Sequence, residues 1–180
     1  MRYSVMIFLL FCPLCNAEGV VSRTVLDGFI RLELPVKFAR MSEYHLRIKY
    51  PGSRPPTEVY SNSNGAVSIA FNYTRNAIHP SQIAEVHAMM SASFRRRYPY
   101  ARWFRSVVIE KFGTSVFVME LMTPAVDTEV HNIIYGIPLK GRLLLVSFNA
   151  TAAEAERWLD VGKRIFDTMQ FPDSEARIMR

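Results

Sequence analysis

Cysteine is almost absent from this sequence, and its two positions limit the chemistry of the rest of the chain. Both cysteines of the 180 residues, Cys12 and Cys15, lie close to the N-terminus. From Asn16 onward there can be no disulfide, no thiolate nucleophile and no zinc–thiolate site. We therefore expect the folded part of the protein to be stabilised by its hydrophobic core alone.

The sequence also lacks an apolar run long enough to cross a membrane. The run at 5–11 is too short for a bilayer. It follows Arg2 and precedes the small residues of 15–17, an order typical of a secretory signal peptide. We predict a signal at 1–17, a mature protein that begins at Glu18, a periplasmic location and no integral membrane segment. Leu14 stands where a lipoprotein signal would need a small residue, so lipidation of Cys15 is not favoured.

Linkers, low-complexity tracts and internal repeats are missing as well. Residues 18–180 are therefore expected to form a single domain, which is long enough to bury about 70% of its unfolded surface. The formal net charge is +6, of which Arg2 contributes one. This modest basic excess favours acidic partners.

Periodicity predicts an α+β fold. Apolar patterning indicates strands at 29–34, 45–50, 66–73, 103–112, 116–122 and 129–137, and the run at 143–148, apolar on both faces, is expected to be a central strand. The turn-rich segment 51–65 is expected to be a surface loop around a short piece at 58–61. One helix should begin at the cap Ser81 and end before Pro99, and a second should bury a stripe that includes Trp158 and Phe166. We predict a mainly antiparallel sheet of about six or seven strands covered by two helices.

Four segments give the chain a family resemblance. IRLELPVKF, VSIAF, GIPLKGRLLLVSF and AERWLDVGKRIFDTM resemble PsbP-like and DcrB-like domains over about residues 28–171. The family has a nuclear relative that binds the Ran GTPase. The resemblance implies a PsbP-like sandwich and a non-enzymatic role, as in extrinsic photosystem subunits, envelope lipoproteins and adaptor proteins of bacterial secretion systems. The chain departs from the lipoprotein branch in lacking its lipidation cysteine.

Catalytic signatures are absent. The sequence has no G-x-S-x-G, H-E-x-x-H, Walker or G-x-G-x-x-G motif, and we predict no enzyme activity and no cofactor. The alternative is a metal-dependent hydrolase that uses Asp127, Glu129 and His131, which alternate along the start of a strand. A solvated strand face explains the same alternation. His87 lies on the apolar stripe of the first helix, as a boundary histidine would.

The stretch FRRRYPYARWFR at 94–105 is the most unusual in composition. Arginines interleaved with aromatic rings are typical of single-stranded nucleic-acid binders. The three arginines at 95–97 are also explained by the last turn of a helix, where cations oppose the macrodipole. Because export separates the protein from nucleic acid, we predict no nucleic-acid partner. Trp103 and Phe104 should divide between core and surface.

We interpret the same stretch as a surface that binds another protein, and we predict that this partner has an acidic surface. Arginine and exposed tyrosine are enriched at binding hot spots. The candidate contacts are Arg96, Arg97, Tyr98, Tyr100 and Arg102, with Arg54 and Tyr60 of the proline-rich loop as possible additions. The predicted role is that of an envelope accessory or adaptor, or of an immunity protein that neutralises a secreted toxin by contact. The sequence leaves these two roles open.

Overall fold

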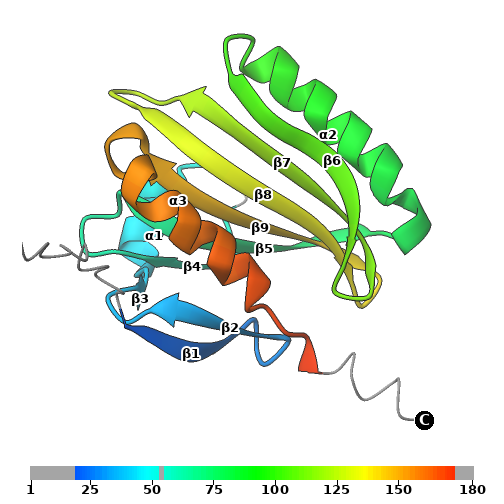
Figure 1. Cartoon of the computed structure of the whole chain (residues 1–180), viewed down its shortest axis with the longest axis horizontal. Coiled ribbons are helices and arrows are strands. Elements are labelled where there is room, and N and C mark those ends of the chain that lie inside the picture. Colours follow the sequence, from blue (N-terminus) through cyan, green and yellow to red (C-terminus); the bar gives the residue numbers. More distant parts are fainter. Residues whose placement is uncertain (1–18, 53–54, 173–180) are drawn as a thin grey trace, which may run out of the picture.

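A seven-stranded antiparallel sheet forms the centre of the computed structural model, which describes residues 19–52 and 55–172 (Figure 1). The signal peptide expected at 1–17 lies outside these residues. The strand order is β3-β4-β5-β9-β8-β7-β6. The elements are β1 (Val20–Val25), β2 (Ile30–Pro35), β3 (Ala39–Arg40), α1 (Glu43–Lys49), β4 (Glu58–Ser61), β5 (Val67–Ala77), the 3-10 turn η1 (Pro80–Gln82), α2 (Ile83–Arg97), β6 (Arg102–Lys111), β7 (Thr114–Pro124), β8 (Glu129–Leu139), β9 (Arg142–Thr151) and α3 (Ala152–Asp167).

Helices α2 and α3 cover opposite faces of this sheet. Phe117 and Met119 of β7 pack with Ile83 of α2, whereas Val116 and Val118 belong to the core that includes the α3 side chains. Strands β7, β8 and β9 are therefore buried on both sides, which explains their nearly continuous apolar sequences. The α+β sandwich predicted from the sequence is confirmed.

The strand expected at 29–34 is present as β2, but it pairs with β1 in a separate two-stranded sheet. A buried carboxylate joins this hairpin to the central sheet. Glu58 of β4 accepts a hydrogen bond from the backbone N–H of Leu26, 2.9 Å away, and another from the Tyr60 hydroxyl at 2.8 Å. Strand β1 was not anticipated, because most of its side chains are exposed and give no periodic signal.

The strand predicted at 45–50 is wrong, because this segment forms helix α1. The Ser42 side chain caps the helix by accepting from the backbone N–H of His45, and the Glu43 carboxylate lies 3.7 Å from the Arg47 guanidinium one turn later. These local contacts outweigh the alternation of apolar residues. Ile48, placed on a buried face by that alternation, is 61% exposed.

The predicted cap at Ser81 is also wrong. Pro80–Gln82 form a 3-10 turn whose N-cap is His79. The His79 ring accepts from the Ser81 N–H, and the Gln82 side chain accepts from the His79 N–H at 2.8 Å, which is a capping box. Helix α2 begins at Ile83.

The last helix forms as its apolar stripe predicts. Trp158, Ile165 and Phe166 of α3 are buried, and the Phe166 ring stacks on Tyr135 of β8 with 4.1 Å between centroids. At Gly162 the helix comes closest to the sheet, since a Cβ there would lie 2.5 Å from the Phe148 ring of β9. Glycine is therefore needed at this position for close packing.

Candidate functional site

The candidate site is the turn between α2 and β6, which we name the α2–β6 corner and define by Arg96, Arg97, Tyr98, Tyr100 and Arg102. Helix α2 ends at Arg97, where the Tyr98 N–H donates to the carbonyl of Phe94. The chain then turns and enters β6, the outermost strand on this side of the sheet. The five residues predicted from the sequence thus lie together at the end of one helix and the start of one edge strand.

The arginines of this region have different surroundings. The Arg95 guanidinium lies 4.2 Å above the Trp103 ring, which places it against the α2 side of β6. The Arg97 Nε donates to the Tyr98 hydroxyl at 3.3 Å. Arg102 forms an ion pair with Glu129 of β8 at 2.9 Å. Arg96 is exposed in the last turn of α2.

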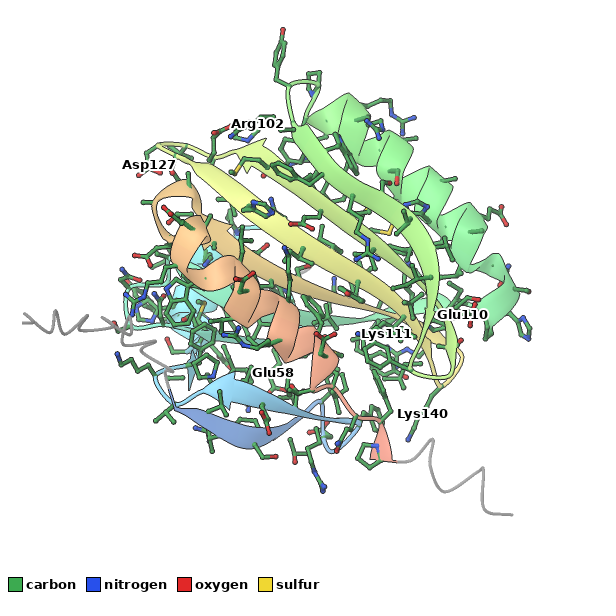
Figure 2. All side chains as sticks on the ribbon, viewed as in Figure 1. Glu58, Arg102, Glu110, Lys111, Asp127 and Lys140 are labelled. Atoms are coloured by element: carbon green, nitrogen blue, oxygen red, sulfur yellow. The ribbon has the colours of Figure 1, made fainter. Side chains whose placement is uncertain are left out.

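Exposed apolar side chains lie in two turns at this end of the sheet. Tyr100 is 91% exposed at the tip of the turn, and Val126 is fully exposed in the neighbouring β7–β8 turn. The labelled Arg102 and Asp127 mark these two turns at the same end of the sheet in Figure 2. Large exposed apolar groups among cations are typical of protein-binding surfaces.

Phe104 extends this surface along β6. The register of β6 shifts between Trp103 and Arg105, a bulge that leaves Phe104 without a partner residue on β7. Phe104 is 56% exposed, and its ring stacks on that of His131, with 4.8 Å between centroids and 6° between planes. Trp103 is half-buried under Arg95, so the two rings divide between core and surface as expected.

The alternative metal ligands do not gather into one site. Glu129 pairs with Arg102, and His131 Nε2 lies 2.9 Å from the Glu120 carboxylate, within hydrogen-bond distance. Asp127 is exposed in the β7–β8 turn. No group of three histidine, aspartate, glutamate or cysteine side chains in the described ranges could hold a metal ion.

His87 has partners that the sequence could not reveal. Its Nε2 lies 2.9 Å from the Ser106 hydroxyl of β6, its ring stacks on Phe117, and Ser91 lies 3.3 Å from the same hydroxyl. Burial lowers the pKa of His87 below its ordinary value. The histidine therefore joins α2 to β6 through its contact with Ser106.

Of the two additional contacts in the proline-rich loop, Tyr60 does not join the corner. Tyr60 is buried in β4, on the far side of the sheet from β6. Burial, followed by its hydrogen bond to Glu58, raises the pKa of Tyr60 to about 12. A buried hydroxyl already bonded to a carboxylate is not available to a partner. Arg54 lies outside the described residues.

Comparison of the chain with known proteins places its fold. No family model and no curated protein sequence matches it. The solution structure of cyanobacterial PsbP (CyanoP) from Synechocystis sp. PCC 6803 matches 89% of this chain and 96% of its own, with a TM-score of 0.61 and 8% sequence identity. The chain has a PsbP-like fold.

Two further structures share the PsbP-like fold. LpqN of Mycobacterium tuberculosis, described as involved in cell envelope biogenesis, has a TM-score of 0.52 and 15% identity over 84% of this chain and 90% of its own. The Ran-binding protein Mog1p of Saccharomyces cerevisiae has a TM-score of 0.50 and 12% identity over 86% and 96%. The family resemblance drawn from the sequence is confirmed at the level of fold.

None of the helices in the described ranges is long and apolar enough to cross a membrane.

Proposed function

We propose that this PsbP-like chain is a non-enzymatic, periplasmic accessory or adaptor protein that binds an acidic protein partner through the α2–β6 corner. One observation carries the proposal: Tyr100, 91% exposed, stands at the tip of a turn that follows three consecutive arginines. An isolated chain gains nothing from exposing this ring. In a complex, the ring and a neighbouring guanidinium are the kinds of side chain that supply most of the binding energy.

The charges around Tyr100 favour an acidic partner. Arg96 and Arg97 are exposed in the last helical turn before Tyr100, and their positive charges add to that of Arg95. Glu129, the acidic residue in contact with this region, is already paired with Arg102. Arginines at the rim of an interface mainly steer the encounter with a partner of opposite charge.

The fold and the predicted export support the same role. Mog1p, which shares the fold, is named for binding another protein, and LpqN for its part in envelope biogenesis. Two of the three residues of the alternative hydrolase site, Glu129 and His131, already contact Arg102 and Glu120.

The test compares two charge reversals of equal size in a pull-down from envelope extract, followed by binding kinetics with the captured protein. The double variant Arg96→Glu with Arg97→Glu should slow association and weaken its salt dependence.

The substitution Tyr100→Ala should speed dissociation and cost about 2 kcal/mol or more of affinity. The control is Lys163→Glu with Arg164→Glu, which reverses two exposed charges near the end of α3.

The control variant should bind like the unaltered protein. Equal loss of binding in both double variants would point to net charge rather than to the corner, and unchanged kinetics in the corner variants would refute the proposal. A captured toxin whose activity the protein abolishes would assign the immunity role in place of the adaptor role.

A further inference from the structure

Strand β6 forms one border of the central sheet, and its outer edge is open (Figure 1). The strand at the other border, β3, has 2 residues, whereas β6 has 10. Strand β6 pairs with β7, and within the described ranges no backbone hydrogen bond joins it to any other segment. A long open edge of this kind is a template for pairing with a further strand.

The β6–β7 turn determines which backbone groups of β6 face the open edge. The turn has two residues, 112–113, both with positive φ, so the residues that flank it form a hydrogen-bonded pair. Hydrogen-bonded and non-hydrogen-bonded pairs alternate along an antiparallel ladder. Ser106, Val108 and Glu110 therefore direct their N–H and C=O groups away from β7, toward the open edge.

The middle of this edge lacks the features that normally protect an edge strand. Such strands are protected by charges, prolines and bulges. In β6 a bulge at 103–105 and the charged residues at 110–111 stand near the two ends. Between them, 106–109 contains no charge and no proline, and Val107 and Val108 are 37% and 38% exposed. This segment therefore suits a second uncharged, β-branched strand.

A second copy of β6 fits this edge in the antiparallel direction. A two-fold axis at Val108 pairs that residue with itself and puts Ser106 opposite Glu110 of the other copy. Each outward-facing residue then finds a main-chain partner. Val107 lies opposite Ile109 of the other copy, and both belong to the face that carries α3, so apolar side chains meet apolar side chains.

The charges at the ends of the paired segment are compatible with this register. Arg105 would lie opposite Lys111 of the other copy, whose ammonium is 2.6 Å from the Asp167 carboxylate. That lysine is therefore balanced, and the Asp167 side chain, 66% exposed, can also attract the incoming Arg105. Figure 2 labels Arg102 at one end of β6 and Glu110 and Lys111 at the other.

We propose that the protein forms a two-fold symmetric dimer in which two β6 strands pair antiparallel around Val108 and join the central sheets into one. This inference goes beyond the proposed function and does not rest on it, because the α2–β6 corner lies outside the paired segment 105–111. The two corners would lie at the two ends of that segment, free to bind.

The test is sedimentation equilibrium of the exported protein at concentrations up to about 1 mM, at which even a weak dimer is populated. We expect a reversible equilibrium between monomer and dimer. Amide hydrogen exchange, measured over the same concentrations, should slow at Val108 as the dimer forms, because its N–H then donates to the other copy.

Three substitutions at Val108 separate backbone pairing from other contacts. Val108→Pro removes the central outward N–H and leaves the β7 ladder intact, since proline is tolerated where the N–H of an edge strand faces solvent. It should raise the dimer dissociation constant about tenfold or more, because both bonds of the central pair are lost. Val108→Lys, which sets two cations opposite each other, should also weaken the dimer and is decisive if the proline variant fails to fold in a thermal melt. Val108→Thr keeps the N–H and the β-branched shape and is the control, which should dimerise normally.

The proposal is overturned by a monomer at every concentration, by a dimer that Val108→Lys leaves unchanged, or by a dimer without slowed exchange at Val108. Slowed exchange that appears only when envelope extract is added would assign the edge to a segment of another protein, and would equally overturn self-pairing. Arg96→Glu with Arg97→Glu should dimerise normally, so failure of the dimer does not bear on the corner.

Discussion

Single residues decide how closely the layers of this molecule can approach. Gly162 lets α3 rest on β9, because a Cβ there would lie 2.5 Å from the Phe148 ring. Gly136 does the same within the sheet, where a Cβ would lie 2.0 Å from the Phe117 ring. Trp158 fills the space between α3 and the loop that precedes β3, and its ring centroid lies 5.4 Å from that of Phe38.

Gly162→Ala should destabilise the protein, although alanine is the better helix former by about 1 kcal/mol. The added methyl group would overlap the Phe148 ring, and overpacking of this kind costs about 1–3 kcal/mol. Urea unfolding of the variant measures the change. Phe148→Leu in the same chain should recover part of the loss, and a stabilised single variant would show that α3 can move away from the sheet.

Trp158→Ala should lower the free energy of unfolding by about 3–5 kcal/mol, because a large side chain is removed from a buried site. Only 4% of the Trp158 side chain is exposed. Equilibrium denaturation gives the value. A loss below about 1 kcal/mol, as for surface substitutions, would contradict the packing of α3 described above.

At the scale of elements, local contacts explain most differences between expectation and structure. Strands β5 to β9 and α3 could be predicted from the apolar patterns of their sequences. Strand β3 was not anticipated, and the segment expected to be a surface loop contains the buried strand β4. Helix α1 could not be predicted, because the apolar residues at 45–50 alternate as in a strand. The Ser42 cap and the Glu43–Arg47 pair, which stabilise the helix, outweigh that pattern. The corner residues were predictable because they are contiguous in sequence, whereas the serine partner of His87 lies on a different element.

The contact between α2 and β6 should make stability depend on pH. Because burial lowers the pKa of His87, the unfolded chain binds this proton more readily than the folded protein. The contribution of His87 is then complete above the ordinary histidine pKa of 6.5 and is lost as the pH falls through the lower folded value.

His87→Gln isolates this effect, since glutamine can still bond Ser106 but does not titrate. Thermal melts from about pH 7.5 to about pH 5 should show a smaller fall in midpoint for the variant than for the unaltered protein. Parallel curves would mean that another group dominates the acid sensitivity.

At the scale of the whole molecule, the fold brings together turns that are far apart in the sequence. A pocket lined by Phe29, Phe112 and Lys140 could not be read from the sequence, since its walls come from turns near residues 29, 112 and 140 that only the fold brings together.

The order of the strands also limits when the sheet can be completed during synthesis. Strands β6 to β9 pair with their neighbours in sequence, so this meander can form as the chain emerges. Strand β5, however, pairs on one side with β9, with Val67 opposite Ala150. Until residue 151 has been made, β5 has an open edge beside an uncovered apolar face, the kind of surface that pairs wrongly or aggregates. The interval between the synthesis of β5 and that of β9 is thus when the nascent chain is most exposed to incorrect strand pairing.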